Sequence, residues 1–380
     1  MKLNSMVSIV NAPRLTSCMI KLATEMQELS KNTIDFCISK ANASYFLKDY
    51  EQSVSWIYFA STVAWTIHPG YFYSRKMEDL LSHISTDCFS NSELPHSIET
   101  QYQPENCVVH IVSTVSGTGG HSRVVEKWIK NCKVFYPEQT HSICLTQQRT
   151  TELPDWILTL VDGVSGRISV LPNNQDFLVK AALLRKICNK ANLIVLHIHP
   201  NDPVANLAFS CSSFTKKILF FNHADHVFSL GGMISDAIVD FRLSGKRVTK
   251  ARRLCSKSFL LPIPLVDGYK NDHDCNRIEQ RLHARKSLGL DLGCRIILTI
   301  GDEYKYKKSL GYDFIDCVRR IFRKDSSVII IGIGLPPKNC WKYLSEEFYG
   351  RFVPLGRIKD RSILEQYYLA ADIYMEGFPF

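Results

Sequence analysis

The feature that most constrains the fold is an alternation of short apolar runs and amphipathic segments along residues 108–375. The apolar runs have the length of strands, and the segments between them have helical spacing. In the first half the expected strands are Val108–Val115, Arg167–Leu171, Leu193–Ile198 and Lys217–Phe221, and the expected helices are Ser122–Asn131 and Gln175–Lys190. Such alternation is typical of a parallel sheet with helices on both faces.

A second alternation follows the stiff segment Leu261–Pro264. Its expected strands are Arg295–Ile300, Val328–Ile331, Phe352–Pro354 and Asp372–Met375, and its expected helices are Asn276–Leu288, Tyr312–Phe322, Trp341–Phe348 and Arg361–Ala370. We therefore expect an α/β protein with two Rossmann-like lobes, residues 107–262 and 265–380.

Residues 1–100 have a different, helical texture. Apolar residues at helical spacing predict a helix over Ala41–Ile67, which His68, Pro69 and Gly70 end, and a second helix over Ser74–Ile84. We expect this α-helical N-terminal region to pack as a cap on the next lobe. The polar segment Ser90–Asn106 is predicted to be a linker.

The composition excludes several classes of protein. The formal charge of +9 suits an anionic ligand or an anionic membrane surface, but no dense basic run predicts nucleic-acid binding. The 13 cysteines form no Cys-x-x-Cys pair, so we expect buried free thiols in a cytoplasmic protein. Met1–Asn11 lacks a signal-peptide core, and no apolar run approaches the about 18–20 residues of a membrane span.

A glycine-rich turn, Gly117–His121, stands between the first expected strand and the following helix. Glycines at Gly119 and Gly120 let the backbone approach a ligand, and the N–H groups of the helix N-terminus favour a phosphate. The motif is not Gly-x-Gly-x-x-Gly, because position 122 is serine, and this counts against a nicotinamide-dependent dehydrogenase.

Histidines and aspartates follow two later strands. His197, His199 and Asp202 surround one strand end, and His223, Asp225 and His226 follow the next. Carboxyl ends of parallel strands are where α/β sheets bind ligands. The spacings are also those of metal chelation, which leaves a metal site as an alternative. A structural, loop-capping role is a further alternative, particularly for Asp202 and His226.

Two features of the second lobe also follow strands. The turn after Thr299 contains Gly301, Lys305 and Lys307, whose ammonium groups suit a diphosphate, although an exposed basic turn is the alternative. The last strand is followed by Glu376 and Gly377.

The order of these motifs resembles that of GT-B fold glycosyltransferases of family four. The resemblance covers about residues 108–380 and implies a GT-B fold with donor and acceptor in the cleft between the lobes. It implies that the Gly119 and Gly120 loop lies against the donor diphosphate and that His223 faces the reacting carbon. The donor-binding residues expected from it are Gly119, Gly120, His121, His199, Asp225, Lys305, Lys307, Glu376 and Gly377. Asp302 stands where the family usually has arginine.

The resemblance implies retaining transfer from a UDP- or GDP-linked sugar to a glycan, lipid-linked or protein acceptor, as in polysaccharide biosynthesis. It implies no metal and no cofactor besides the nucleotide-sugar. The positive net charge is compatible with peripheral association at the inner face of the membrane. The family continues beyond the position of Phe380, so the sequence predicts an incomplete second lobe. A truncated, non-catalytic binding module and a dinucleotide-dependent oxidoreductase are the alternatives.

Overall fold

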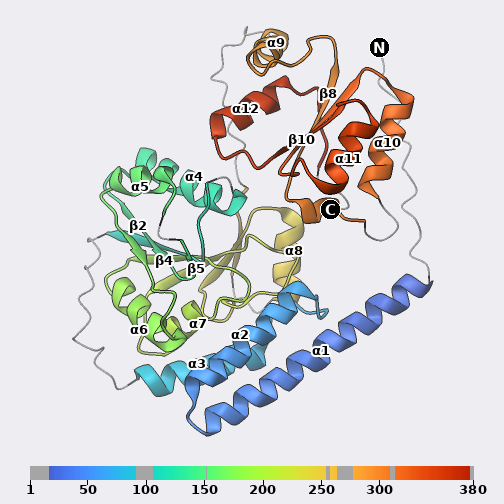
Figure 1. Cartoon of the computed structure of the whole chain (residues 1–380). Coiled ribbons are helices and arrows are strands. Elements are labelled where there is room, and N and C mark those ends of the chain that lie inside the picture. The colour runs from blue at the N-terminus through green and yellow to red at the C-terminus, as the bar shows by residue number, and fades with distance from the viewer. Residues whose placement is uncertain are drawn as a thin grey trace. The chain divides into compact units, whose positions relative to one another are not determined.

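The computed structural model describes residues 17–90, 106–117, 119–150, 152–253, 257–262, 277–308 and 313–376. The chain forms two compact units, a larger one over residues 20–265 and a smaller one that contains residues 266–380. Each unit contains a parallel sheet flanked by helices, which confirms the expected α/β class (Figure 1). Most of the expected linker, residues 263–264 of the proline segment and Gly377 lie outside the described residues.

The larger unit contains a seven-stranded sheet in the order β3-β2-β1-β4-β5-β6-β7, and every neighbouring pair is parallel. The strands are β1 Cys107–Val112, β2 Thr140–Leu145, β3 Ile168–Val170, β4 Leu193–His197, β5 Lys217–Phe221, β6 Ala237–Asp240 and β7 Ser258–Leu260. The strand order reverses between β1 and β4. In sheets of this order, the crevice at the carboxyl ends of those two strands is the usual ligand site.

Helices cover both faces of this sheet. They are α4 Gly120–Phe135, α5 Asp155–Asp162, α6 Phe177–Cys188, α7 Val204–Phe209 and α8 Leu243–Arg252. Along β1, Val109 and Ile111 pack in one core with α6 and α7, whereas Val108 and Val112 pack in cores with α4 and α5. Both faces of β1 are buried, which explains why its sequence is an apolar run.

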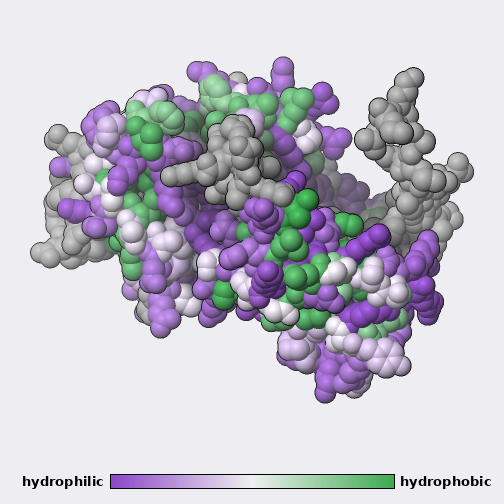
Figure 2. All heavy atoms as spheres, turned by 90° about the horizontal axis from the view of Figure 1, so that it is seen from above, coloured by the Kyte–Doolittle hydropathy of each residue, from purple (hydrophilic) through white to green (hydrophobic). Residues whose placement is uncertain are grey.

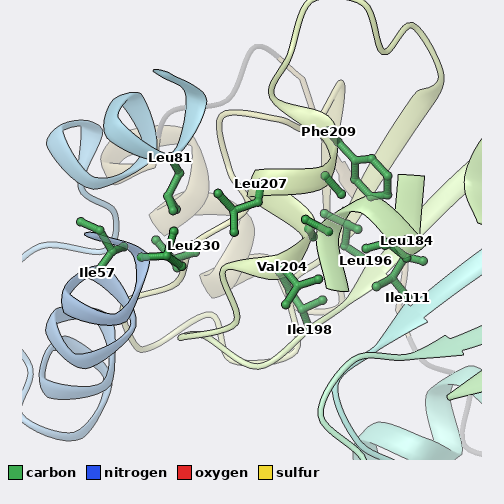
Figure 3. Packing of buried hydrophobic residues seen from close by; sticks show 14 of the residues in the cluster. Ile57, Leu81, Ile111, Leu184, Leu196, Ile198, Val204, Leu207, Phe209 and Leu230 are labelled. Atoms are coloured by element: carbon green, nitrogen blue, oxygen red, sulfur yellow. The ribbon is translucent and has the colours of Figure 1, made fainter. Parts of the chain in front are cut away.

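The N-terminal helices belong to the larger unit. They are α1 Ser17–Phe46, α2 Tyr50–Thr66 and α3 Arg75–Phe89. Ile57 of α2 and Leu81 of α3 share a continuous core with Leu207 of α7 and Leu230 (Figure 3). Two sets of hydrogen bonds strengthen this packing. Glu51 accepts hydrogen bonds from the first turn of α6, and Glu78 accepts one from Asn206 Nδ2 at 2.9 Å.

The first expected helix, Ala41–Ile67, is interrupted, because Ala41 belongs to α1 whereas α2 begins at Tyr50 and ends just before Ile67. Lys48 takes a positive φ of 61°, and Asp49 starts α2 by accepting a hydrogen bond from the backbone N–H of Gln52 at 3.1 Å. A cap of this kind satisfies an N–H group that has no partner within the helix. The apolar spacing continues through the break, which is why it predicted one helix.

The smaller unit contains a four-stranded parallel sheet in the order β10-β9-β8-β11. The strands are β8 Arg295–Ile300, β9 Val328–Ile333, β10 Phe352–Gly356 and β11 Ile373–Tyr374, and a short 3-10 helix, η1 Glu303–Tyr306, follows β8. The helices are α9 Arg277–Ser287, α10 Phe314–Lys324, α11 Asn339–Glu347 and α12 Arg361–Ala370. The strand order reverses between β8 and β11, as it does between β1 and β4 in the larger unit.

Several elements of the larger unit were not predicted. Residues Thr140–Leu145 form β2, although this segment begins with polar Thr140 and His141. The helix α5 is short, with only eight residues. The expected strand Val108–Val115 ends at Val112, after which the chain turns into the glycine-rich loop. Tertiary pairing with β1, rather than local pattern, makes Thr140–Leu145 a strand.

The surface of the described residues is mainly polar in the view from above, with hydrophobic residues in small groups (Figure 2). Among the described helices, none combines the length and the apolar character needed to span a membrane.

Candidate functional site

The reversal between β1 and β4 brings the first predicted motifs together. Asp202, which follows β4, accepts hydrogen bonds from Ser113 Oγ at 2.6 Å, from Thr146 Oγ1, and from the backbone N–H of Val204 at 3.1 Å. Its side chain is fully buried. Asp202 therefore holds the ends of β1, β2 and β4 in place, which agrees with the structural interpretation of this residue.

The glycine-rich turn forms the N-terminus of α4, where Gly119 is the N-cap and Gly120 the first helical residue. The backbone N–H of Gly119 donates to Ser116 Oγ at 2.9 Å, and a Cβ at Gly119 would lie 2.5 Å from that oxygen. At Gly120 a Cβ would meet nothing within 4 Å among the described residues. The first turn of α4 therefore presents N–H groups and the positive end of a 16-residue helix beside open space, which favours an anion.

Four histidines form a hydrogen-bonded row across the sheet: His141 on β2, His110 on β1, His197 on β4 and His223 after β5. The Nδ1 of His141 lies 3.1 Å from Nε2 of His110, and Nδ1 of His110 lies 3.1 Å from Nε2 of His197. The Nδ1 of His197 lies 2.9 Å from Nε2 of His223. Each contact is within hydrogen-bond distance.

Strand register explains the row. His141 pairs with Val108, and His197 pairs with Val112. His110 lies midway between those two valines on β1, and alternate residues of a strand face the same side. The three strand histidines therefore lie diagonally on one face of the sheet, where Trp128 of α4 packs edge-on against His110 and His197.

The row couples the tautomers of its members. A neutral imidazole has one N–H donor and one acceptor nitrogen, so each contact needs one partner of each kind. If His223 carries its proton on Nε2, then His197, His110 and His141 carry theirs on Nε2 as well. If His141 carries its proton on Nδ1, the other three do the same. A change of proton position at His223 is therefore linked to the tautomers of three buried rings.

Burial keeps these rings neutral. It lowers the pKa of His110 to about 3 and that of His141 to about 4. Burial and the neighbouring imidazoles hold the pKa of His197 and of His223 well below the usual value of 6.5. At neutral pH, His223 is therefore a hydrogen-bond donor or acceptor without charge.

His121, in the first turn of α4, completes the group. Its ring centroid lies 4.0 Å from that of His223, and burial lowers its pKa to about 4. The ring nitrogens that His121, His197 and His223 can offer lie within 4.8 Å of one another, so this group could hold a metal ion. Neutral imidazole is the form that binds metals, but His197 and His223 are here hydrogen-bonded to each other.

His199 connects this group to a cavity. Its Nε2 lies 3.3 Å from Thr114 Oγ1, and its ring centroid lies 6.1 Å from that of His121. On the other side its ring lies 5.9 Å from that of Trp65, at the end of α2. His199 also lines a cavity of about 730 Å³ between α2 and the carboxyl edge of the sheet.

The structure gives Asp225 a protein partner. Arg242 donates from Nε to Asp225 Oδ2 at 2.6 Å and from a second guanidinium nitrogen to Oδ1. Burial by itself would raise the pKa of Asp225, but hydrogen bonds and charge from Arg242 outweigh it and lower the pKa. A Cβ at Gly245 would lie 2.1 Å from Asp225 Oδ2, so this ion pair requires glycine there. The exposed His226 lies beside the carboxylate at 3.5 Å.

In the smaller unit, the predicted donor residues lie where the strand order reverses. Lys305 belongs to η1, directly after β8, and its Cδ lies 3.2 Å from a Cβ built on Gly301. Lys307 follows η1 and is exposed. Glu376 follows β11, the neighbour of β8, and its charge raises the pKa of Tyr306 in η1, after the larger effect of burial. The structure thus places Lys305 and Glu376 at one edge of the sheet.

Backbone crowding accompanies these residues. Gly334, after β9, has a φ of +92°, and a Cβ there would lie 2.2 Å from the carbonyl oxygen of Gly301. The backbone N–H of Gly334 donates to the carbonyl of Gly356, the last residue of β10, at 2.6 Å. Three glycines therefore bring three strand ends close together, and Gly334 and Gly356 were not among the predicted residues.

Neither a protein-family model nor a curated protein matches the sequence. Among solved structures, an O-GlcNAc transferase variant from Thermobaculum terrenum is 13% identical, with a TM-score of 0.45, over 94% of this chain and 65% of that one. Two structures of the wall teichoic acid polymerase TagF are 10% and 9% identical, with TM-scores of 0.35 and 0.37. They align with 80% and 79% of this chain and with 69% and 70% of theirs. Similarity at this level assigns neither a family nor an activity.

The sequence interpretation missed His110 and His141. Each is a histidine within a buried strand, in the runs Val108–Val112 and Thr140–Leu145. A histidine at an interior position of an apolar run was the available signal, but the row itself depends on the pairing of strands distant in sequence.

Proposed function

We propose that this protein is a glycosyltransferase of GT-B type that uses a UDP- or GDP-linked sugar. The observation that supports the proposal is that the predicted motifs lie in loops at, or one strand from, the strand-order reversal of each sheet. In the larger unit the Gly119 turn follows β1, at the reversal, and His223 follows β5, one strand away, with its ring centroid 4.0 Å from that of His121. In the smaller unit Lys305 follows β8 and Glu376 follows β11, on the two sides of the reversal. These are the positions at which α/β sheets bind nucleotides and their phosphates.

The chemistry assigns one task to each group. Lys305 and Lys307 of the smaller unit neutralise the leaving diphosphate, which is the largest electrostatic task in the transfer. In the larger unit, the N-terminus of α4 offers N–H groups to an anion. His223, kept neutral by burial, uses its second ring nitrogen to hydrogen-bond the sugar or the acceptor hydroxyl near the anomeric carbon. Glu376 hydrogen-bonds hydroxyls of the donor.

We further propose that the reaction retains the anomeric configuration and that the acceptor is a glycan, lipid-linked or protein hydroxyl. NMR of the first-formed product tests the stereochemistry. A product with the anomeric configuration of the donor supports retention. An inverted product would instead assign His223 the role of general base, because inversion requires direct removal of the acceptor proton.

The first test is a calorimetric titration of the chain with UDP and with GDP, followed by hydrolysis assays with the matching nucleotide-sugars. We expect saturable binding of one nucleotide and slow release of its sugar to water. A folded protein that binds neither nucleotide, and that hydrolyses none of the donors, would contradict the proposal. Binding of NAD in place of UDP or GDP would favour the oxidoreductase alternative.

A further inference from the structure

The cavity beside His199 has the walls of a saccharide site. Tyr58 and Trp65 of α2 line one side with Phe177 of α6, and the ring centroids of Tyr58 and Phe177 lie 5.4 Å apart. Trp65 is 36% exposed, and it lines a cavity of about 730 Å³. Pyranose rings have one apolar C–H face, which packs well on the flat face of an aromatic side chain.

Two buried polar side chains also line the cavity. Asn201 is 4% exposed; its Nδ2 donates to Thr62 Oγ1 at 2.8 Å, while its buried Oδ1 has no hydrogen-bond partner among the described residues. A buried acceptor without a partner costs free energy unless a ligand or water supplies a donor. A sugar hydroxyl in the cavity is such a donor.

Lys180 gives the cavity a positive charge. It is 7% exposed, and its Nζ lies 3.4 Å from the carbonyl oxygen of Thr146. An ammonium has three N–H donors, so two remain for a ligand. The carboxylates of Asp202 and Glu51 attract this ammonium, but both already accept hydrogen bonds from the protein. Arg149 adds a second cation, and the described lining contains no carboxylate.

We propose that this cavity binds an acidic saccharide, with its apolar ring face on Trp65 and Tyr58 and its carboxylate at Lys180 and Arg149. Its position makes this saccharide the acceptor, a step that builds on the proposed glycosyl transfer. His199 forms part of the cavity wall, and His121 connects it to His223 through ring centroids 6.1 and 4.0 Å apart. The volume is within the range of about 300–1,000 Å³ that is usual for small-molecule sites.

The test is direct binding of the full chain, without donor, to an array that displays glycans ending in uronic or sialic acid beside neutral counterparts. We expect retention of acidic glycans at least tenfold above neutral ones, with the best glycan then titrated in solution. Lys180→Met should remove the preference for acidic glycans, and Trp65→Ala should weaken binding of both kinds. Arg149→Gln, at an exposed position, should lower acidic binding severalfold in a variant that folds normally.

Matched controls come from the same unit. Phe59→Ala removes an exposed aromatic residue of α2 that does not line the cavity, and Lys250→Met removes an exposed lysine of α8. Both should leave glycan binding unchanged. Equal binding of acidic and neutral glycans, no binding of either, or full binding by Lys180→Met and Arg149→Gln would overturn the proposal.

The outcomes also separate this proposal from the glycosyltransferase assignment. Nucleotide binding and donor hydrolysis without retention of acidic glycans would support the glycosyltransferase assignment and refute saccharide binding in the cavity. Specific acidic-glycan binding without nucleotide binding would support the cavity as a saccharide-binding site and refute the transferase.

Discussion

At the scale of single residues, environment separates side chains that look alike in the sequence. Asp202 and Asp225 both follow strands, yet each is held by protein partners: the first by hydroxyl and backbone donors, the second by Arg242. His223 differs, because one ring nitrogen bonds to His197 while the ring remains only partly buried. A functional role is therefore better supported for His223 than for either aspartate.

Replacing His223 tests that role. His223→Ala should reduce transfer about 100-fold, the lower end of the usual contribution of a group that acts on a proton in the transition state. Nucleotide affinity should change less than twofold, because the proposed contacts to diphosphate come from other residues. His226→Ala, at an exposed neighbouring position, is the control and should leave both values unchanged. Full turnover by His223→Ala would show that this assignment is wrong.

The basic turn after β8 allows a separate test. Lys307→Ala should weaken UDP or GDP binding about fivefold, since an exposed charge–phosphate contact contributes about 1 kcal/mol, and the loss should shrink at high salt. Lys324→Ala, at the end of α10 that leads into the opposite edge of the sheet, should bind normally. If Lys307→Ala binds normally and Lys305→Ala does not, the diphosphate contact belongs to Lys305.

At the scale of elements, strand ends rather than strands define the sites. Both sheets reverse their strand order once, and the loops at the reversal carry the glycines and the polar residues. In the smaller unit the loop after β9 approaches the loop after β8 more closely than side chains allow, because a Cβ at Gly334 would lie 2.2 Å from the carbonyl oxygen of Gly301.

Gly334→Ala should therefore destabilise the smaller unit. The positive φ costs a residue with a Cβ about 1–2 kcal/mol, and the clash with the Gly301 carbonyl should bring the total to about 3 kcal/mol. Gly350→Ala is the matched control, with a φ of +80° but nothing within 4 Å of the added Cβ among the described residues. Urea unfolding measures both, and equal losses would show that the close approach does not occur in solution.

At the scale of the whole molecule, the buried histidines predict sensitivity to acid. The pKa of His110 falls to about 3 and those of His121 and His141 to about 4, from 6.5, so the unfolded chain binds more protons than the folded one between about pH 6.5 and 4. Stability is then complete above pH 6.5 and decreases as the pH falls through this window. Glu78 acts in the opposite direction, because burial raises its pKa to about 7.

Thermal unfolding between pH 7.5 and 4.5 checks this sign. The midpoint temperature should fall as the pH is lowered. His141→Gln should lower the pH dependence of the unfolding free energy by about 1.4 kcal/mol per pH unit, the contribution of one proton, so the midpoint temperature should fall less steeply. Glu78→Gln should make the decrease steeper, because it removes the group that gains stability on acidification. A midpoint that is constant or rises toward pH 4.5 would contradict the neutral, buried state of the histidine row.

Local sequence determined the class of the fold and most of its elements. Apolar runs of strand length fix β5 Lys217–Phe221 and β8 Arg295–Ile300 at the predicted residues, and glycines mark the turn before α4, because periodicity and backbone freedom are properties of short segments. The same information placed His223 and Lys305 after strands.

Tertiary structure decided which of those residues meet. The row from His141 to His223 exists because β2, β1, β4 and β5 are neighbours in the sheet, although they are separated along the chain. The cavity of Trp65 and Lys180 exists because α2 packs across α6. Such contacts depend on pairing and packing between distant segments, and local periodicity does not encode them.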